Sequence, residues 1–542
     1  MRRKMILTGA AVSVALDLVA IPLFDTPREP SFDPAAAGWT RVFHDDFDGD
    51  AVDTNKWYRP HFCRKGMDIG TDGKGHAVFR MRKGEDGRLP NGYLYSVPEY
   101  EYGYYEARVR FTSALGWGAA SWMYGGSNQN PFLDGFEIDT FEDFYTRLKD
   151  GHCLRDKMAH SMHSKIGPVT SSQQCVSTVR KTADDFHLIA CKWDPLAISF
   201  YLDGELVGGY NAFENATCIR PLHAILSAER SRGGLGVHEK PGCEEGDYVI
   251  DRVSVWKDLK GEALAPKVTW KTDMGSVFAP TGTVEHLAVD AVSPDPADPV
   301  EQVYLFDNGH FILADTEPPY AFEMPLTEAF LRTTSYGRFR THAGREMPPL
   351  DGYPHVFVAF ARTKSGRVGH TGPFVRILLP QPGPAAYEDR PAAVPGTVEA
   401  WKFDVGGQDK AYHKVVLNKK TGSRSPSASA SPRPDDPVDL SKSRLGPTFA
   451  GEWYDYTVDV AATGDYRATL RYASAVRSAN AVWLLCDGRL VGEFAIPAGD
   501  YYDSNPTRTT TADVKLPAGR HVLTVFCKSQ ISFAGIDFGN VP

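Results

Sequence analysis

The chain has 542 residues, of which 42% are hydrophobic and 23% are charged, and its formal net charge at pH 7 is -9. This length is enough for several domains, each with its own core. The mild acidity and the lack of a basic patch with interleaved aromatic residues argue against a nucleic-acid partner.

The first residues have the pattern of a bacterial export signal. Arg2, Arg3 and Lys4 precede an apolar run over residues 5–16, which Asp17 interrupts. This run is far shorter than the roughly 20 residues that a membrane-spanning helix needs. We therefore expect a signal peptide over residues 1–20, a secreted or periplasmic location and no membrane span.

Residues 37–258 consist of short segments rich in Val, Phe, Tyr and Trp, separated by Gly, Asp, Asn and Pro, which is the pattern of strands joined by turns. The clearest predicted strands are 42–47, 77–81, 104–111, 121–124, 186–193, 199–202 and 248–256. Many strands with few competing helices favour an all-β fold, a jelly roll of two stacked antiparallel sheets with one concave face.

The stretch Glu137-Ile138-Asp139-Thr140-Phe141-Glu142 carries the strongest chemical signal. In a regular strand Glu137 and Asp139 share one face, whereas Glu142 lies on the other. A β-bulge near Thr140 and Phe141 would shift the register by one residue and return Glu142 to the face of the first two acids. We therefore predict three carboxylates along one groove.

Carboxylates placed this close repel one another, so the pKa of one is raised and it keeps its proton. One ionised and one protonated carboxyl group are what the hydrolysis of a glycosidic bond requires. The alternative is a solvated edge strand whose charges discourage aggregation. The apolar, aromatic segment 116–124 just upstream favours a sugar cleft, with Trp117 and Trp122 as candidates to stack on a sugar ring.

Two further sets of polar residues are candidates for this groove or for a metal. His160 and His163 are an odd number of positions apart, so only one of them can face the groove, and we interpret His160 as a polar surface residue. Asp48, in an acidic segment, and Asp251 could supply oxygens to a calcium ion, although Asp48 could equally belong to a simple turn.

Several motifs, in one order, resemble glycoside hydrolase family 16. They are residues 43–49 with Trp57, residues 102–108, the acidic strand in its bulged form, His163, residues 187–204 and residues 251–256. This resemblance covers residues 37–258 and implies a concanavalin-like jelly roll. It also implies that Glu137 is the nucleophile, that Glu142 is the acid/base, and that Asp139 orients the nucleophile. It places His163 beside the catalytic groove, allows a structural calcium ion and implies that catalysis needs no cofactor.

A second strand-rich region follows the linker at 259–266. Strands are predicted at 268–270, 284–292, 300–306, 321–324 and 355–361, with Asp307-Asn308-Gly309 as a hairpin turn. Residues 267–379 resemble the immunoglobulin-like spacers of exported bacterial enzymes, and we predict no functional site there.

The proline-rich segment 380–386 predicts a stiff spacer. Beyond it, segments 451–458, 464–466, 470–474 and 516–519 resemble carbohydrate-binding module family 6 over residues 396–542, which implies a third β-sandwich. In that family, aromatic residues at one edge clasp a sugar; this chain has Tyr501 and Tyr502 where a tryptophan is frequent. Residues 419–434, rich in Ser, Pro and Ala, predict a disordered loop.

The eight cysteines allow disulfides in an exported chain, but buried free thiols are the alternative. Cys191 lies in an apolar run and is expected in the core. Cys153 and Cys175 flank a polar segment and are the better candidates for a disulfide.

These observations lead to one expected function and its alternatives. We expect a retaining endo-glycosidase that hydrolyses a β-linked polysaccharide, with β-1,3-glucan favoured and the galactans agar, porphyran and carrageenan as alternatives. Catalysis is assigned to Glu137, Asp139 and Glu142. A carbohydrate-binding jelly roll without catalysis and a transglycosylase are further hypotheses. We expect a monomer.

Overall fold

The computed structural model describes part of the chain. The described residues are 29–60, 66–82, 90–112, 117–126, 130–143, 148–149, 152–153, 157–166, 169–178, 185–230, 245–327, 352–379, 384–415, 431–433, 436, 438–474, 478–496 and 508–541. The predicted signal peptide and the loop that carries Tyr501 and Tyr502 lie outside these residues.

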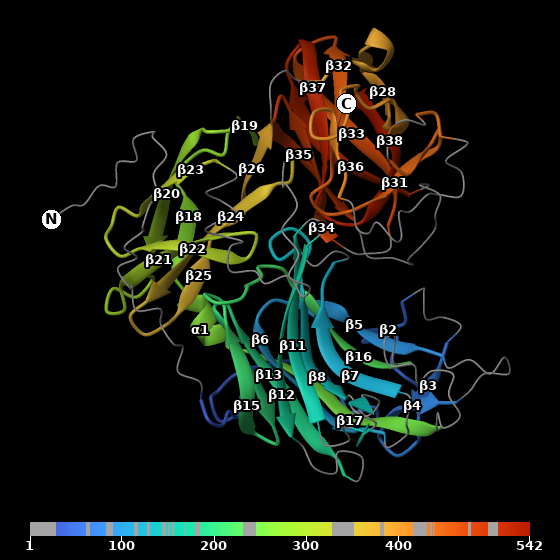
Figure 1. Cartoon of the computed structure of the whole chain (residues 1–542), viewed down its shortest axis with the longest axis vertical. Helices are drawn as coiled ribbons and strands as arrows, with labels where there is room; N and C mark the ends of the chain where they lie inside the picture. Colours follow the sequence, from blue (N-terminus) through green and yellow to red (C-terminus); the bar gives the residue numbers. More distant parts are fainter. Residues whose placement is uncertain are drawn as a thin grey trace.

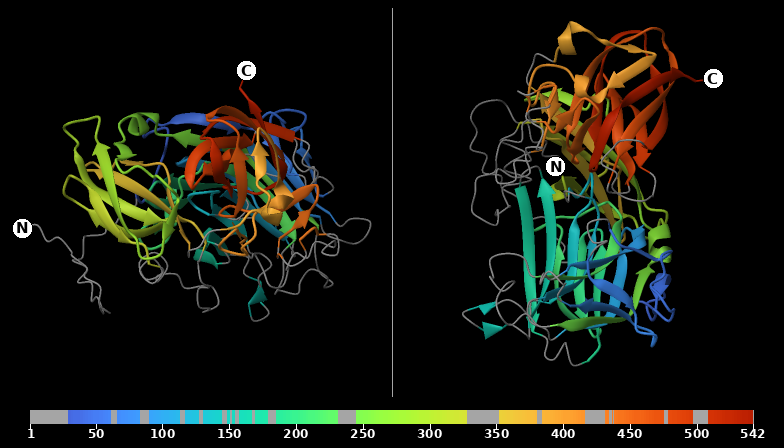
Figure 2. Two further views of the ribbon diagram at one scale, coloured as in Figure 1. Left: turned by 90° about the horizontal axis from the view of Figure 1, so that it is seen from above. Right: turned by 90° about the vertical axis from the view of Figure 1, so that its right-hand side faces the viewer.

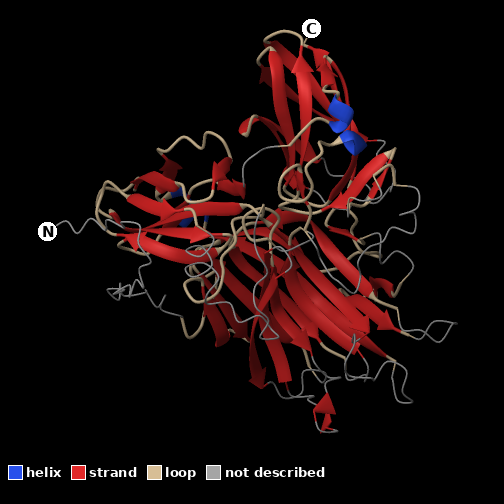
Figure 3. Cartoon of the chain, turned by 45° about the horizontal axis from the view of Figure 1, so that its top comes forward, coloured by secondary structure: helices blue, strands red, loops and turns tan. Residues whose placement is uncertain are grey.

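Strands make up nearly all of the regular structure, and helices are confined to short segments such as α1 (Leu259–Ala263) (Figure 3). The strands form three groups in chain order, which meet around a common centre (Figures 1 and 2). The chain is therefore all-β, as predicted.

The first group contains two large antiparallel sheets. The outer sheet has β15 (Glu205–Asn211), β14 (Ala197–Leu202), β13 (His187–Asp194), β6 (Gly103–Arg110), β17 (Gly246–Lys257), β4 (Ala77–Met81) and β3 (Asp68–Thr71) in that order, with β1 (Thr40–Asp45) on β17. The inner sheet has β12 (Val169–Thr178), β11 (Lys157–Ile166), β8 (Glu137–Asp143), β7 (Trp117–Tyr124), β16 (Leu222–Arg230), β5 (Gly92–Tyr100) and β2 (Trp57–Tyr58). β9 (Leu148–Lys149) and β10 (His152–Cys153) form a separate small pair.

The core of this jelly roll lies between the two sheets. Side chains that alternate along each strand supply it, among them Val109 of β6, Ile138 of β8 and Phe200 of β14, all fully buried. Since successive side chains of a strand point to opposite faces, filling this core leaves the other face of the inner sheet free to carry polar groups.

The second group also consists of two sheets. One has β18 (Lys267–Trp270), β20 (Val284–Val292) and β23 (Ala321–Pro325); the other has β19 (Phe278–Pro280), β26 (Phe374–Leu379), β24 (His355–Thr363), β21 (Val300–Asp307) and β22 (His310–Asp315), with β25 (Val368–His370) on β24. The predicted hairpin turn is confirmed, because Asn308 and Gly309 join β21 to β22 with φ angles of 47° and 87°.

The third group repeats this arrangement. One sheet has β27 (Ala392–Val394), β32 (Trp453–Val460), β37 (Gly519–Cys527), β34 (Ser478–Cys486) and β35 (Arg489–Ile496), with β29 (Tyr412–His413) on β32. The other has β30 (Leu440–Ser441), β31 (Arg444–Thr448), β38 (Ile531–Asn540), β33 (Gly464–Ala473) and β36 (Arg508–Leu516), with β28 (Gly396–Glu399) on β38.

One apolar cluster joins all three groups. It combines Phe132 and Phe213 of the jelly roll with Phe306 of the second group and Trp453 of the third. The contacts include Phe213 against Phe306, with ring centroids 6.1 Å apart, and Phe278 against Trp453, at 5.4 Å. The second group is therefore packed tightly against both neighbours, which the expectation of a simple spacer did not anticipate.

The described cysteine side chains are free thiols. Cys191, Cys218, Cys486 and Cys527 are all buried, which confirms the core position of Cys191. The side chains of Cys153 and Cys175 lie outside the described residues, so their disulfide stays a prediction. Among the described residues, no helix has both the length and the apolar character needed to cross a bilayer.

Phe306→Ala would remove a fully buried ring from the shared cluster. The resulting cavity should lower the free energy of unfolding by about 3–5 kcal/mol. Because the cluster joins the three groups, all thermal transitions seen by calorimetry should move down together.

The matched control is Leu264→Ala, at a side chain that is 37% exposed. It should change the stability by less than about 0.5 kcal/mol. A shared core would be contradicted if the thermal transitions of the first and third groups kept the same melting temperatures in Phe306→Ala.

Candidate active site

The acidic strand β8 lies in the middle of the inner sheet, between β7 and β11 (Figure 1). Glu137 pairs with Tyr124 of β7 and with His163 of β11, and Asp139 pairs with Trp122 and Ser161. Side chains of directly paired residues lie on the same face of a sheet. The two acids, Trp122 and His163 therefore share one face.

The predicted β-bulge is confirmed. On β7, Trp122 pairs with Asp139 and Ser121 with Phe141, so Thr140 is the extra residue of β8. The same irregularity appears against β11, between Ala159 and Ser161. Beyond it Glu142 pairs with Ala159, two positions from Ser161, which returns Glu142 to the face of the other acids.

A buried histidine holds this bulge in place. His160 Nδ1 donates to the carbonyl oxygen of Thr140 at 2.8 Å, and the imidazole packs between Phe141 and Phe200, with ring centroids 4.3 Å and 5.1 Å away. Burial lowers the pKa of His160 to about 4, so the ring is neutral at neutral pH. The interpretation of His160 as a surface residue was wrong, because its side chain is fully buried and satisfies a bulge carbonyl that has no strand partner.

Glu137 and Asp139 are held in an environment that resists a second negative charge. Burial, followed by the charge of Asp139, raises the pKa of Glu137 well above its usual value, whereas His163 acts in the opposite direction. Burial, followed by the charges of Glu142 and Glu229, likewise raises the pKa of Asp139. A hydrogen bond with Glu137 acts in the opposite direction and lowers the pKa of Asp139, so the titrations of the two carboxyl groups are linked.

His163 is the group that lowers the pKa of Glu137. Its Nε2 lies 2.9 Å from Asp139 Oδ2, and its side chain is 24% exposed. The expectation that only His163 of the two histidines faces the groove is confirmed.

Glu142 occupies a more open position than its neighbours. It is half-buried, whereas Asp139 is 3% exposed, and Ser161 Oγ lies 3.4 Å from Glu142 Oε2. A carboxyl group that solvent reaches can exchange its proton between two steps of a reaction.

An aromatic surface continues the same face away from the acids. Trp122 is partly exposed, donates from Nε1 to Ser227 Oγ at 3.1 Å, and lies edge-on to Tyr95 and tilted against Tyr124. Tyr58 and Tyr93 complete this cluster. The side chain of Trp117, the first residue of β7, lies outside the described residues, so its predicted sugar contact stays a prediction.

Two polar features of this face were missed in the sequence. His223 donates from Nδ1 to the carbonyl of Ser96 at 2.8 Å, and its Nε2 lies 3.3 Å from both Tyr58 Oη and Glu99 Oε1. Glu229 follows on the same strand, where it pairs with Gly118. The alternation of His223, Ser227 and Glu229 with apolar residues was the signal that would have revealed them.

Asp48 and Asp251 do not fit a calcium site. Asp251 Oδ2 accepts from Arg108 at 3.1 Å and from Arg252 at 3.0 Å, so two cations already neutralise it. Within the described part of the chain, neither acid belongs to a cluster of potential metal ligands. The structure gives no support for the predicted ion.

Two other clusters bring potential metal ligands together. Glu137, Asp139 and His163 form one, and Cys486, Asp487 and His521 in the third group form the other, with ligand atoms within 4.8 Å of one another. In both, the histidine already pairs with the aspartate, at 2.9 Å and 2.7 Å.

The pairing in the third group is a feature of hairpins. His187 and Asp203 in the jelly roll make the same contact at 2.7 Å without a cysteine. In both places the aspartate also accepts from the backbone N–H of the residue that follows the histidine. We therefore assign a structural role to this pair.

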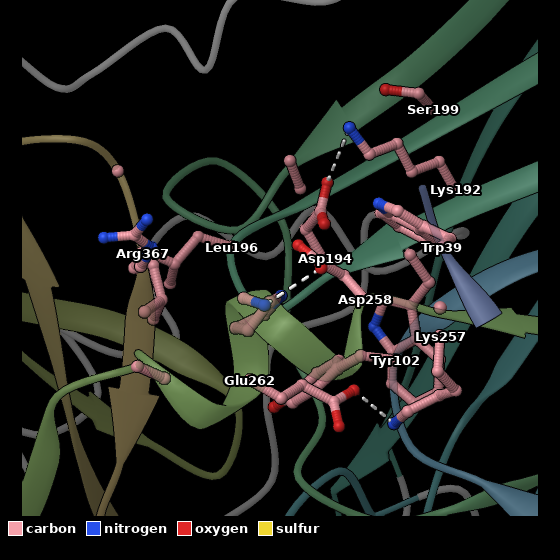
Figure 4. Close-up of a pocket in the computed structure, with 18 of the residues that line it drawn as sticks. Trp39, Tyr102, Lys192, Asp194, Leu196, Ser199, Lys257, Asp258, Glu262 and Arg367 are labelled. Carbon is pink, nitrogen blue, oxygen red and sulfur yellow. Dashed lines mark hydrogen bonds and ion pairs between the residues drawn. The ribbon is translucent and has the colours of Figure 1, made fainter. Parts of the chain in front are cut away.

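A cavity of about 830 Å³ lies between the jelly roll and the second group, away from the acids (Figure 4). Trp39, Tyr102 and Leu196 line it. Its lysines are already paired, since Lys192 Nζ lies 2.8 Å from Glu29 Oε1 and Lys257 Nζ lies 2.7 Å from Glu262 Oε1. It contains none of the acids of β8 and is not the active site.

Comparison with known proteins agrees with the site. Residues 59–223 match glycosyl hydrolases family 16, and residues 426–539 match carbohydrate binding module family 6. These matches confirm both family resemblances seen in the sequence.

Individual relatives are distant. Beta-porphyranase E of Zobellia galactanivorans is 28% identical over 201 residues, which cover 32% of this chain and 69% of that protein. The long isoform of ulvan lyase from an Alteromonas species is 26% identical over 207 residues, which cover 35% of this chain and 19% of that protein. The chain thus spans about a fifth of the length of the ulvan lyases that it matches.

Solved structures similar to the chain include an endo-1,3-beta-glucanase from Streptomyces sioyaensis. It is 23% identical and covers 42% of this chain and 99% of its own, with a TM-score of 0.33. The Bacillus licheniformis beta-glucanase is 17% identical and covers 40% of this chain and 97% of its own, also with a TM-score of 0.33.

The neutral His160 predicts a pH-dependent stability. Its pKa is about 4 when folded and 6.5 as the ordinary value, so unfolding takes up a proton between these limits. The stabilisation is therefore complete above pH 6.5 and is lost as the pH falls toward 4. Between pH 7 and pH 4.5, urea unfolding should lose about 2–3 kcal/mol more in the native chain than in His160→Gln.

Equal pH dependence in the two proteins would show that His160 is not buried in its neutral form. His310, whose pKa burial lowers to about 3, remains in both proteins and cancels in the comparison.

Proposed function

Because the chain carries a catalytic domain of glycosyl hydrolases family 16 and a carbohydrate-binding module of family 6, we propose that it is a retaining endo-glycosidase that hydrolyses a neutral β-1,3-glucan. The observation that carries the proposal is the bulge at Thr140, which gathers Glu137, Asp139 and Glu142 on one face beside aromatic rings. A sheet face of this kind has the groups for both bond cleavage and sugar stacking.

In the first step the polysaccharide lies along the inner sheet with its glycosidic oxygen at Glu142. Glu142 donates a proton to this leaving oxygen while ionised Glu137 attacks the anomeric carbon. The C–O bond to the leaving sugar breaks as the bond to Glu137 forms, which gives a glycosyl-enzyme. In this step Asp139 carries a proton that it donates to Glu137 in a hydrogen bond, which leaves the negative charge on Glu137 before the attack.

In the second step Glu142, now ionised, takes a proton from water. The resulting oxygen attacks the anomeric carbon and releases Glu137. The His163–Asp139 contact keeps Asp139 in the orientation that donates to Glu137, so the nucleophile stays fixed through both steps.

The charge of the face supports a neutral substrate. Glu229 adds a fourth carboxylate close enough to raise the pKa of both Glu137 and Asp139. Lys165, on the same face of β11, is half-buried, and burial lowers its pKa. Sulfate or carboxylate groups on a polysaccharide would meet repulsion here, whereas the hydroxyl groups of a glucan can donate to these oxygens.

A galactan is the alternative substrate. One observation favours it, the 28% identity to a beta-porphyranase over 69% of that protein. A carbohydrate-binding protein without catalysis is the alternative of another class, but it has no need of the bulge.

The third group and the export signal extend the proposal. We assign polysaccharide binding to the family 6 module, which would hold the enzyme on its substrate. Export through the signal peptide at 1–20 would place the enzyme where polymers too large to enter a cell are met.

Glu137→Gln and Glu142→Gln test the catalytic assignment. Glu137→Gln removes the nucleophile and should lower kcat on laminarin by roughly 10³-fold or more. Glu142→Gln removes the proton donor and should lower kcat by about 10²–10⁴-fold. Reducing-end release measures both, with lichenan, agarose, porphyran and carrageenan assayed in parallel.

The matched control is Glu205→Gln, which makes the same chemical change at an exposed glutamate on the outer sheet and should leave kcat unchanged. Release from porphyran or carrageenan but not from laminarin would replace the glucan by a galactan. Binding of one polymer without any cleavage would overturn the catalytic proposal.

Glu229→Gln tests the electrostatics of the site. Without this charge the raised pKa values of Glu137 and Asp139 move down, so the acidic limb of the profile of kcat/KM against pH should shift to lower pH. The profile is measured on whichever polymer is cleaved. An acidic limb that stays in place or moves up would show that Glu229 does not act on the pair.

A further inference from the structure

The loop that leads into β8 is built around one buried residue, Asn130. Its carbonyl oxygen accepts from the backbone N–H of Asp134 at 2.9 Å and of Gly135 at 2.8 Å. Its side-chain Oδ1 accepts from the N–H of Phe132 and Leu133, each at 3.2 Å. One fully buried residue thus fixes the backbone of residues 130–135, through both its backbone carbonyl and its side chain.

This loop is coupled directly to the position of Glu137. Gly135, with a φ of 126°, packs so closely on Gly125 that a Cβ would lie 2.6 Å from the Gly125 carbonyl oxygen. Gly125 in turn donates to the carbonyl of Phe136 at 3.3 Å. A shift of the loop therefore moves the start of β8, where Glu137 is the first residue.

Residues of the second group of strands form hydrogen bonds with the side chain of Asn130. Asn130 Nδ2 donates to Tyr353 Oη at 2.6 Å and lies 3.4 Å from Asn308 Oδ1. Asn308 and Tyr353 are 0% and 2% exposed, and Asn308 Nδ2 also donates to the carbonyl of Pro354 at 2.9 Å. These partners belong to the predicted spacer, not to the jelly roll.

The hairpin turn at Asn308 and Gly309 fits the jelly roll without free space. A Cβ on Gly309 would lie 2.7 Å from Pro131 Cβ and 2.7 Å from the Thr217 carbonyl oxygen. Thr217 N–H donates to the Gly309 carbonyl at 2.9 Å. Phe132, next to Pro131, packs in the apolar cluster that contains Phe306 of the second group.

From these contacts we propose that the second group is a positioning part of the active site, in which the Asn308–Gly309 turn and Tyr353 fix the loop 130–135 and through it the backbone of Glu137. The inference rests on the proposed function, because it assigns the catalytic role to Glu137. Tyr353, Asn308 and Asn130 are positioning residues, since none of them touches the substrate in this account.

Two variants loosen this support. Tyr353→Phe removes only the hydroxyl that accepts from Asn130. Asn308→Gly removes the side chain at a φ of 47°, where glycine carries no backbone strain. Asn308→Gly also removes the hydrogen bonds from Asn308 Nδ2 to the Pro354 carbonyl and to Asp307 Oδ1, so Tyr353→Phe is the more conservative variant.

The control is Phe278→Leu, which weakens the contact between the second and third groups at Trp453 without touching the loop. It should lower the melting temperature and leave kcat per folded enzyme unchanged.

The experiment combines hydrogen exchange with kinetics on the full-length chain. In Tyr353→Phe and Asn308→Gly we expect faster exchange of the amides of residues 132–135 and a kcat about 10-fold lower, with KM nearly constant, since small misplacement of a reacting group is costly. Phe278→Leu should show neither change.

Hydrogen exchange and kcat together distinguish a failure of the positioning role from a failure of the proposed function. Unchanged exchange at 132–135 would overturn the positioning role, whatever the activity. Faster exchange with unaltered kcat would show that the loop does not position Glu137. If the native chain cleaves no polysaccharide while the variants still alter exchange, the proposed function fails and the coupling of the loop to the second group stands.

Discussion

The hydrogen bond from His160 to the carbonyl of Thr140 is the interaction on which the site depends. A bulge leaves one backbone carbonyl without a strand partner, and a buried carbonyl without a partner is costly. His160 removes that cost by donating from Nδ1, and burial between Phe141 and Phe200 keeps its ring neutral. Without the bulge, Glu142 would point into the apolar core.

Burial also controls the electrostatics of the acids. Glu137 and Asp139 are buried, so the pKa values of both are raised, and His163 partly offsets this increase for Glu137. Burial thus raises the pKa of these two carboxyl groups, and the order of the side chains along β8 places the charges of Asp139 and Glu142 beside them.

The sequence predicted this site well because strand geometry is a short-range property. The period of two along Glu137, Asp139 and Glu142 was enough to require a bulge. The bounds predicted for β4 and β20 also agree with the structure, since both are alternating segments closed by turn residues. The calcium site found no support, because the arginines that neutralise Asp251 come from β6 and from its own neighbour.

What the sequence could not show depends on contacts between distant segments. The role of His160 arises from Phe200, on another strand of the opposite sheet, and Glu229 reaches the acids only because β16 pairs with β7. The second group gave no local signal of a functional role, since Asn308 and Tyr353 acquire theirs only by meeting Asn130 across a domain boundary. Such pairings follow from packing and not from periodicity.

The central claim is that Glu137 is the residue that bonds to the sugar, and trapping of the intermediate tests it most directly. A 2-deoxy-2-fluoro glycosyl fluoride of a β-1,3-glucobiose slows the second step, so the glycosyl-enzyme accumulates and its peptide can be identified by mass spectrometry. The account predicts one adduct per chain, on Glu137. An adduct on Asp139 or Glu142 would contradict it.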